Sequence, residues 1–248
     1  MARAGAAGAV VPSAGKGERL GGHTAKAFVP LAGKPLVLHT LHALQHTPAI
    51  RWVVVVARPG DQARVRRLVR RHRLTKVSAI VEGGASRAVS VARGMAALPP
   101  EARWVVIHDG ARPCVTPRLI NEVLRRARRC GAVACGLRAP VTVKAVDREC
   151  LVRLTLDREG LWLVQTPQAF RRDWFLDAAA RANHRLDHFP DDAAILEWAG
   201  FPVRMVPGDP LNIKVTTPED LVLAEAVLQR RVQKSEVRGQ KSERTRFL

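Results

Sequence analysis

The stretch that decides the fold is WVVVVA, residues 52–57, a run of apolar, mostly β-branched residues without polar alternation. Such a run is typical of a strand buried on both faces of a sheet. Similar short runs recur along the chain and predict further strands at 10–13, 77–81, 104–107 and 132–137. Between them, amphipathic segments predict helices at 35–45, 61–73, 86–98 and 116–129. This alternation predicts an α/β fold with a Rossmann-like, mainly parallel sheet in three layers.

The alternation of strands and helices stops at Ala139–Pro140. Three short strand candidates then follow with polar turns and no helix between them, at 141–146, 151–156 and 161–164. Strands without crossover helices pair antiparallel, so we expect a β-arm over about 139–165 that projects from the sheet. Beyond the arm, helices are expected near Asp173 and Ala193, and closing strands at 203–206 and 213–215.

The last predicted helix begins at Thr217, where an N-cap threonine precedes Pro218 and two acidic residues. Proline at the first helical position and acids at the positive end of the helix dipole both favour a helix start. We expect this helix to end at about Arg231. Residues 232–248 are basic and poor in hydrophobic side chains, so we expect them to be disordered. The predicted organisation is therefore one domain, 1–231, followed by a tail, 232–248.

The chain has 248 residues, of which 47% are hydrophobic, and a net charge of +19. These values are typical of a globular protein with anionic partners. Much of the charge lies in two segments, 64–76 and 230–246, which together hold 14 of the 41 cations. Aromatic residues are only 4%, with no tyrosine, so the stacking surface of single-strand nucleic-acid binders is thin. A solvated basic surface is favoured over specific nucleic-acid recognition.

Four cysteines, at 114, 130, 135 and 150, form no C-x-x-C pair. We expect reduced thiols in a cytoplasmic protein. No apolar run approaches the roughly 18 residues of a membrane span, so no membrane partner is expected.

Ligands of an open parallel sheet bind beyond the carboxyl ends of its strands. The first predicted strand is followed there by PSAGKGERL, residues 12–20, and then by Lys26. Gly15 and Gly17 permit close backbone approach to a phosphate, and Arg19 and Lys26 supply the charge that a triphosphate requires. The motif is neither a Walker motif nor a dinucleotide fingerprint, and a plain turn is the alternative.

Two further motifs follow predicted strands. HDGARP, residues 108–113, places Asp109 directly after the strand at 104–107. A carboxylate there is expected to bind a sugar hydroxyl, a cation or an arginine, and a surface pair with Arg112 is the alternative. EGGASR, residues 82–87, with Ser90 combines glycines with a helix N-terminus, which suits an anion or a base. Simple helix entry is the alternative for this motif.

Together with VTVK, LVQTPQAF, DDAAILEWAG and NIKVTTPEDLVLAE, these motifs occur in the order of one enzyme family. Over roughly residues 9–229 the chain resembles the 2-C-methyl-D-erythritol 4-phosphate cytidylyltransferases of the non-mevalonate isoprenoid route. The resemblance implies that a substrate phosphate oxygen attacks the α-phosphorus of CTP, releasing pyrophosphate and giving a CDP-linked methylerythritol. Ribitol 5-phosphate cytidylyltransferase is the nearest alternative, because it shares the nucleotide half. A basic nucleic-acid-binding protein is the more distant one.

The resemblance also implies roles for individual residues. The implied catalytic residues are Arg19, Lys26 and Lys214. The implied nucleotide-binding residues are Ser13, Ala14, Gly15, Gly84, Ser90 and Asp109, with Asp109 also a candidate ligand of Mg²⁺. The implied polyol phosphate site consists of Asp109, Arg112, Thr142, Arg158, Thr166 and Lys214. Because Thr142 and Arg158 lie on the arm, the resemblance implies a homodimer in which they serve the partner's active site.

Overall fold

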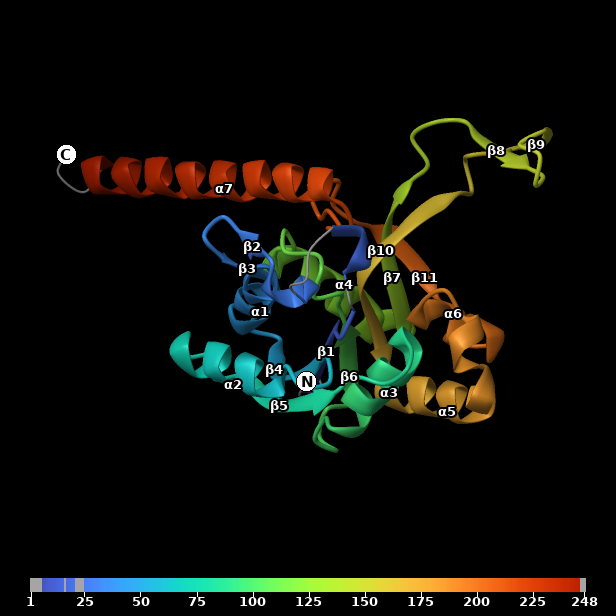
Figure 1. Ribbon diagram of the computed structural model, residues 1–248, viewed down its shortest axis with the longest axis horizontal. Coiled ribbons are helices and arrows are strands. Elements are labelled where there is room, and N and C mark those ends of the chain that lie inside the picture. Colours follow the sequence, from blue (N-terminus) through green and yellow to red (C-terminus); the bar gives the residue numbers. More distant parts are fainter. Residues whose placement is uncertain (1–5, 16, 21–24, 246–248) are drawn as a thin grey trace.

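A computed structural model describes residues 6–15, 17–20 and 25–245 (Figure 1). Its centre is a seven-stranded sheet in the order β11-β7-β10-β6-β1-β4-β5. These strands are β1 (Ala7–Ser13), β4 (Ile50–Ala57), β5 (Val77–Glu82), β6 (Trp104–Ile107), β7 (Ala132–Arg138), β10 (Trp162–Arg171) and β11 (Arg204–Pro207). Only β10 runs antiparallel to its neighbours, β6 and β7. The predicted mainly parallel α/β fold is confirmed.

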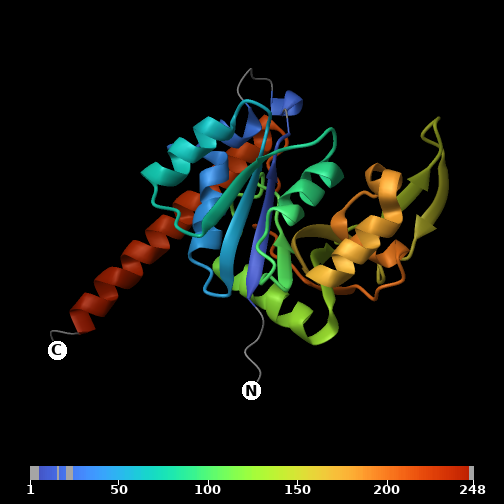
Figure 2. The same ribbon diagram turned by 90° about the horizontal axis from the view of Figure 1, so that it is seen from below.

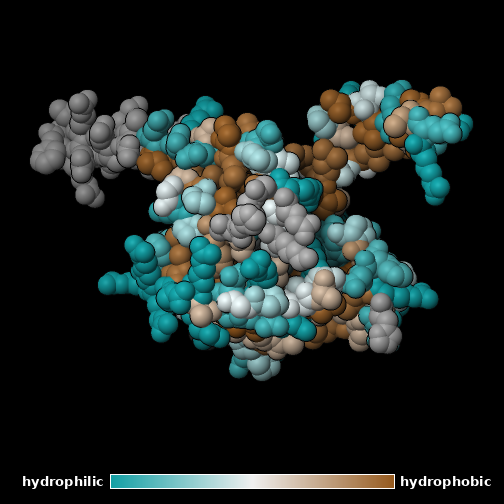
Figure 3. All heavy atoms as spheres, viewed as in Figure 1, coloured by the Kyte–Doolittle hydropathy of each residue, from teal (hydrophilic) through white to brown (hydrophobic). Residues whose placement is uncertain are grey.

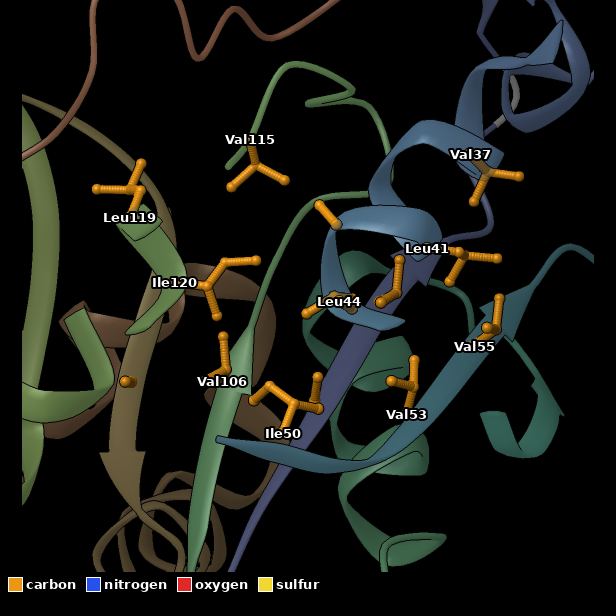
Figure 4. Close-up of a cluster of buried hydrophobic side chains, with 14 of the residues drawn as sticks. Val37, Leu41, Leu44, Ile50, Val53, Val55, Val106, Val115, Leu119 and Ile120 are labelled. Carbon is orange, nitrogen blue, oxygen red and sulfur yellow. The ribbon is translucent and has the colours of Figure 1, made fainter. Parts of the chain in front are cut away.

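Helices cover both faces of this sheet (Figure 2). One face carries α1 (Leu36–Gln45), α2 (Gln62–Arg71) and α4 (Pro117–Cys130), and the other carries α3 (Arg87–Ala96), α5 (Arg172–Ala182) and α6 (Asp192–Trp198). Along β4, Val53 and Val55 pack into the first core, while Val54 and Val56 pack into the second. Because both faces of the strand are buried, its sequence is apolar without alternation. Figure 4 shows part of the first core, where Leu41 and Ile120 face the sheet.

Two short hairpins lie outside the central sheet. One pairs β2 (Pro30–Leu31) with β3 (Lys34–Pro35), and the other pairs β8 (Val143–Val146) with β9 (Val152–Leu156). The β8–β9 hairpin projects well away from the body, as the predicted arm should (Figure 1).

Two helix starts bring N-termini to the carboxyl edge of the sheet. The Oγ atom of Ser86 accepts a hydrogen bond from the Val89 N–H at 3.2 Å, and α3 begins at the next residue. The Oγ1 atom of Thr116 accepts from the Leu119 N–H at 3.2 Å, with Pro117 at the first helical position of α4. Serine and threonine are both favoured N-cap residues, and proline is favoured at the first helical position.

The third strand expected in the arm is instead the start of β10, which continues into the central sheet as far as Arg171. The predicted strand end at residue 164 is wrong. Pro167 cannot donate a backbone hydrogen bond and therefore suggests the end of a strand, but β10 continues through it. The pairing of β10 with β7 shifts register between Gln165 and Gln168, and this irregularity accommodates the proline.

The predicted strand at 213–215 is also wrong. These residues form an irregular loop, in which the Val215 N–H donates to the Ala111 carbonyl oxygen at 2.8 Å. Val215 is fully buried, so its apolar character reflects burial under the loop rather than pairing in a sheet.

The last helix, α7 (Pro218–Thr245), begins where expected but does not end at Arg231. Disorder from residue 232 is therefore a wrong prediction for 232–245, and residues 246–248 lie outside the described part. Residues 232–245 contain no proline and are mainly Gln, Lys, Arg and Glu, which have favourable helix propensities. Figure 1 shows this end of α7 leaving the body of the protein. In the described residues, no helix has the length and apolar character needed to cross a bilayer.

Gly94 fixes how closely α3 approaches the sheet. A Cβ atom at this position would lie 2.4 Å from Val10 Cγ1 and 2.9 Å from Val56 Cγ2. Gly94→Ala gains up to about 1 kcal/mol of helix propensity, but overpacking costs roughly 1–3 kcal/mol. We expect a lower melting temperature by calorimetry. The control Gly160→Ala, with no atom within 4 Å of its Cβ, should leave it unchanged. Equal melting temperatures for the two variants would contradict this packing argument.

Candidate functional site

A cavity of about 750 Å³ opens where β1, β4, β5 and β6 end. Such a volume is typical of a small-molecule site. Its walls come from residues 12–15, 58–59, 84–87 and 109–111, with further contributions from Lys26, Ala27, Leu36, Ser90 and Lys214. Among the described residues, this lining contains four cationic side chains and one carboxylate, Asp109. The cavity is therefore suited to a ligand with several negative charges.

Asp109 is the centre of the charged network. Its Oδ2 lies 2.9 Å from Lys214 Nζ, and its Oδ1 accepts from Arg87 Nε at 3.2 Å and Nη2 at 3.1 Å. Arg112 Nε lies 3.9 Å from Oδ2. Burial raises the pKa of this carboxyl, but the charges of Arg87 and Lys214 outweigh it and hold the pKa well below its usual range. Asp109 is therefore a carboxylate at any physiological pH. The alternative of a surface pair with Arg112 alone is excluded.

Arg87 also contacts a second carboxylate, because its Nη2 lies 2.7 Å from Oδ2 of Asp192 in the first turn of α6. Asp192 is fully buried, and this burial raises the pKa of its carboxyl despite the opposing charge of Arg87. Sequence reasoning missed both residues as parts of the site. The signals were the acid pair at 191–192 before an apolar run and the arginine in EGGASR.

Lys26 lies in the cavity wall close to the other predicted catalytic cations. Burial lowers its pKa, and the charges of Lys214 and Arg19 lower it further. Gly17, at φ +78°, brings the motif against this lysine, since an added Cβ would lie 2.8 Å from Lys26 Cβ. Arg19 is exposed in the short 3-10 helix Glu18–Leu20 and does not line the cavity. Lys16 lies outside the described residues.

The predicted nucleotide-binding residues also line the cavity: Ser13, Ala14, Gly15, Gly84 and Ser90. Ser90 Oγ accepts from the Gly84 N–H at 3.0 Å and donates to the Ser86 carbonyl oxygen at 2.8 Å, which shapes the turn before α3. Ser13 Oγ is buried and has no hydrogen-bond partner within the described structure. A buried hydroxyl without a partner beside a cavity is suited to a ligand atom.

Thr166 and Arg112 are buried behind Asp109 and do not belong to the cavity lining. The Thr166 hydroxyl accepts from the Asp109 N–H at 3.0 Å. Arg112 Nη1 donates to the Asn212 carbonyl oxygen at 2.8 Å, and Asn212 Nδ2 donates to the Thr166 carbonyl oxygen at 2.7 Å. These bonds join β10 and the loop that carries Lys214 to the segment after β6.

Thr142 and Arg158 lie together at one end of the β8–β9 hairpin. Arg158 is exposed and donates from Nη1 to the Pro140 carbonyl oxygen at 3.4 Å. Neither residue lines the cavity of its own chain, so their role stays a prediction. The arm exposes large apolar side chains among hydrophilic ones (Figure 3), with more than half of Val141, Val146, Leu151, Val152 and Leu154 exposed.

Asp109 does not suit the role of Mg²⁺ ligand suggested for it. Both its oxygens already contact cations, Arg87 on one side and Lys214 on the other. In the described part of the chain, no group of three or more His, Cys, Asp or Glu side chains could hold a metal ion.

His108 makes stability depend on pH. Its imidazole is fully buried, and burial lowers its pKa to about 4. In the unfolded chain the pKa is about 6.5, so the unfolded state binds more protons between pH 4 and 6.5. The contribution of the neutral His108 imidazole to the free energy of unfolding is therefore fully present above pH 6.5. It falls by on the order of 3 kcal/mol as the pH drops to 4.

Urea titrations at several pH values measure this effect, and His108→Asn should remove most of the slope between pH 6.5 and 4. The matched control is the exposed His46, because His46→Asn should keep the slope. If His108→Asn keeps the pH dependence of the wild-type protein, the buried imidazole of His108 is not its cause.

Comparison with known proteins agrees with this geometry. A sequence profile of the 2-C-methyl-D-erythritol 4-phosphate cytidylyltransferase family, IspD, matches residues 7–230. The enzyme of that name from Pelotomaculum thermopropionicum is 46% identical over 224 residues, covering 90% of this chain and 94% of the relative. The one from Desulforamulus reducens is 42% identical over 224 residues, covering 90% of this chain and 96% of the relative.

A solved structure of 2-C-methyl-D-erythritol 4-phosphate cytidylyltransferase from Thermus thermophilus has a TM-score of 0.74 and 34% identity. It covers 90% of this chain and 99% of that one. A 4-diphosphocytidyl-2C-methyl-D-erythritol synthase structure from Anaerococcus prevotii reaches a TM-score of 0.79 at 26% identity, covering 91% and 97%. With the family profile matching nearly the whole domain, the chain belongs to the 2-C-methyl-D-erythritol 4-phosphate cytidylyltransferase family.

Proposed function

We propose that the cavity at the carboxyl edge of the sheet is where CTP and 2-C-methyl-D-erythritol 4-phosphate react. The observation that carries this proposal is the cluster of Lys26, Lys214 and Arg87 around a nucleotide-sized cavity. Both substrates are anions, so the site must offset their mutual repulsion before they can meet. The family assignment supplies the identity of the two substrates.

The reaction requires little covalent work from the protein. A phosphate oxygen of methylerythritol phosphate bonds to the α-phosphorus of CTP, the bond to the bridging oxygen breaks, and pyrophosphate leaves with the electron pair. The attacking phosphate is already ionised, so no general base is required. Catalysis then depends on positioning and on charge stabilisation in the transition state.

Lys26 and Arg19 would bind the triphosphate and stabilise charge at the α-phosphorus. Lys26 lines the cavity, and after burial the charges of Lys214 and Arg19 lower its pKa, as neighbouring cations do. Lys214 belongs beside the attacking phosphate, where its contact with Asp109 keeps its Nζ at the cavity wall. Each such cation contributes roughly 3–4 kcal/mol to transition-state stabilisation, as measured for single donors in other enzymes.

The remaining lining suits the nucleoside. Ser13, Ala14 and Gly15 follow β1 and would line the nucleotide, with the buried Ser13 hydroxyl available to it. Gly84 and Ser90 would read cytosine and ribose from the turn before α3. Asp109 is an acceptor held in ionised form, which suits hydroxyl groups of the ribose or the polyol.

A divalent cation such as Mg²⁺ fits this site only as a companion of the nucleotide. Mg²⁺ commonly binds substrate phosphates and keeps several waters. Because the oxygens of Asp109 are occupied by cationic side chains, we assign no protein ligand to the metal.

We further propose a homodimer formed through the arm. Thr142 and Arg158 are implied in substrate binding, but neither lies at the cavity of its own chain. The arm also exposes more than half of several large apolar side chains, including Val152 and Leu154. Exposed apolar surface of this kind is typical of a protein interface. A second copy would cover the arm and receive Thr142 and Arg158 at its polyol phosphate site.

The substrate panel is the first test. Purified protein with CTP and Mg²⁺ should release pyrophosphate with methylerythritol phosphate, and far more slowly with ribitol 5-phosphate. Pyrophosphate release across four nucleotides and both polyol phosphates measures this directly. A preference for ribitol 5-phosphate would reverse the substrate assignment. The similar proteins described above are named as methylerythritol phosphate enzymes.

Lys26→Ala and Lys214→Ala should each lower turnover by a factor of roughly 100–1000, because each removes a cation that acts on the reacting phosphates. The matched control is Lys34→Ala, since Lys34 is exposed on β3 and does not line the cavity. Circular dichroism should show all three variants folded. A turnover near that of the wild type in either of the first two would remove that lysine from the mechanism.

Mixing two inactive variants tests the shared site. Lys26→Ala lacks a cation of its own cavity, whereas Arg158→Ala lacks a side chain that is donated to the partner. Random pairing of equal amounts makes half of the dimers mixed, and each mixed dimer keeps one complete site of two. Roughly a quarter of the wild-type activity should therefore return after co-refolding. Two variants that stay inactive after subunit exchange, shown by mass-tagged copies, would contradict a shared site.

A further inference from the structure

The loop between β11 and α7, residues 208–217, carries Lys214 to the cavity. Lys214 Nζ lies 2.9 Å from Asp109 Oδ2, and the lysine side chain is 44% exposed. In the same loop, Asn212 and Val215 are fully buried. All residues of the loop are described, and none of them belongs to a helix or a strand. Its course must therefore be fixed by hydrogen bonds outside regular secondary structure.

Strand β10 offers an anchor for this loop at its irregularity. The pairing of β10 with β7 shifts register between Gln165 and Gln168, and its pairing with β6 begins only at Gln168. Thr166 is therefore paired with neither neighbouring strand. Asn212 Nδ2 donates to the Thr166 carbonyl oxygen at 2.7 Å. Because buried backbone oxygens are nearly always hydrogen-bonded, this side-chain amide takes the place of a strand partner.

Gln165 binds the first part of the same loop. Its Nε2 donates to the Asp209 carbonyl oxygen at 3.1 Å, and its Oε1 accepts from the Asp209 N–H at 3.2 Å. One side chain thus pairs with both backbone groups of Asp209. Gly208 permits this close approach, because an added Cβ there would lie 2.4 Å from Gln165 Oε1. The loop is therefore bound to β10 at two points, Asp209 and Asn212.

We propose that Asn212 is a positioning residue that sets the place of Lys214 at the cavity. The Asn212 carbonyl oxygen also accepts from Arg112 Nη1 at 2.8 Å, and the Val215 N–H donates to the Ala111 carbonyl oxygen at 2.8 Å. These bonds lie on either side of Lys214 along the chain. The lysine backbone is therefore held from both directions, while its side chain reaches the cavity.

Thr166 is a common reference for both partners of the Lys214–Asp109 ion pair. Its carbonyl oxygen binds Asn212 on the lysine side, and its hydroxyl accepts from the Asp109 N–H at 3.0 Å. Loss of the Asn212 amide would free the lysine side while Asp109 stays in place. Lys214 would then lie less often beside Asp109 and beside the attacking phosphate. This last step rests on the proposed function, which places Lys214 at that phosphate.

The hold on the loop is tested without substrate or turnover. The Val215 N–H exchanges with solvent when the loop opens, so its exchange rate in the full-length chain reports how firmly the loop is bound. Asn212→Ala should speed this exchange roughly 10- to 100-fold, the effect expected for a lost buried hydrogen bond. Lys214→Ala should change it by less than about 3-fold, because a half-exposed ion pair adds little to the hold.

Unchanged exchange of the Val215 N–H in Asn212→Ala would overturn the inference, whether or not the protein transfers cytidylate. Absence of pyrophosphate release by the wild type would instead overturn the proposed function. In that case the exchange measurement would still decide how the loop is held.

Turnover tests whether Asn212 acts through Lys214. Asn212→Ala should lower kcat with CTP and methylerythritol phosphate roughly 10- to 100-fold. In a Lys214→Ala background the same substitution should change kcat by less than about 2-fold, because the group that it positions is already absent. The control Asn121→Ala, on α4 and outside the cavity lining, should keep wild-type turnover. A full loss that persists in the Lys214→Ala background would overturn the positioning role.

A second variant separates the hydrogen bond from packing. Leucine has the same number and branching of side-chain heavy atoms as asparagine but no donor, so Asn212→Leu should behave as Asn212→Ala does in both measurements. If Asn212 merely fills space, Asn212→Leu would restore exchange and turnover, and the inference would be overturned. Should circular dichroism show these variants unfolded, Gln165→Met removes the other anchor. It should likewise speed Val215 exchange and lower kcat only where Lys214 is present, and wild-type values for both would overturn the inference.

Discussion

The site depends on one carboxylate among several cations. Asp109 contacts Arg87 and Lys214 at hydrogen-bond distance, with Arg112 close behind. Without it, these cations would repel each other at the mouth of a buried cavity, where charges are weakly screened. One carboxylate offsets only part of their charge, and the pKa of Lys26 is lowered first by burial and then by the charges of Lys214 and Arg19. The cavity therefore keeps a net positive charge, which suits a ligand with several negative charges such as a triphosphate.

The same network joins distant parts of the chain. Through Asp109, the segment after β6 contacts α3 and the loop before α7, and through Arg87 it reaches the buried Asp192 of α6. A second link ties the start of α3 to the segment before α6, because Ser86 Oγ donates to Asp187. Helices from one face of the sheet are therefore fixed to the cavity by ion pairs as well as by apolar packing. Folding of that layer and assembly of the site depend on each other.

Local sequence patterns were sufficient to predict most strands of the central sheet and most helix starts. The unbroken valine run of β4 and the caps at Ser86 and Thr116 report burial and helix starts within a few residues. The extent of β10 was not predictable in this way, because a proline at its centre is accommodated by pairing with strands far away in sequence. The pairing of Arg87 with Asp192 spans 105 residues and leaves no local periodicity. Motif order placed Lys26 and Asp109 at the site, but only the fold shows which cation each carboxylate holds.

The cavity wall and the residues behind it differ in their exposure to solvent. Cations of the wall reach solvent, and Lys214 is 44% exposed. Such groups follow charge and tolerate different geometries. Behind Asp109, by contrast, Thr166, Asn212 and His108 are buried and bonded to one another in defined directions. A network of this kind resists rearrangement, because an unpaired buried group costs about 1–3 kcal/mol. The buried residues therefore fix the backbone at Asp109 and the loop that carries Lys214, while the cations of the wall supply the charge.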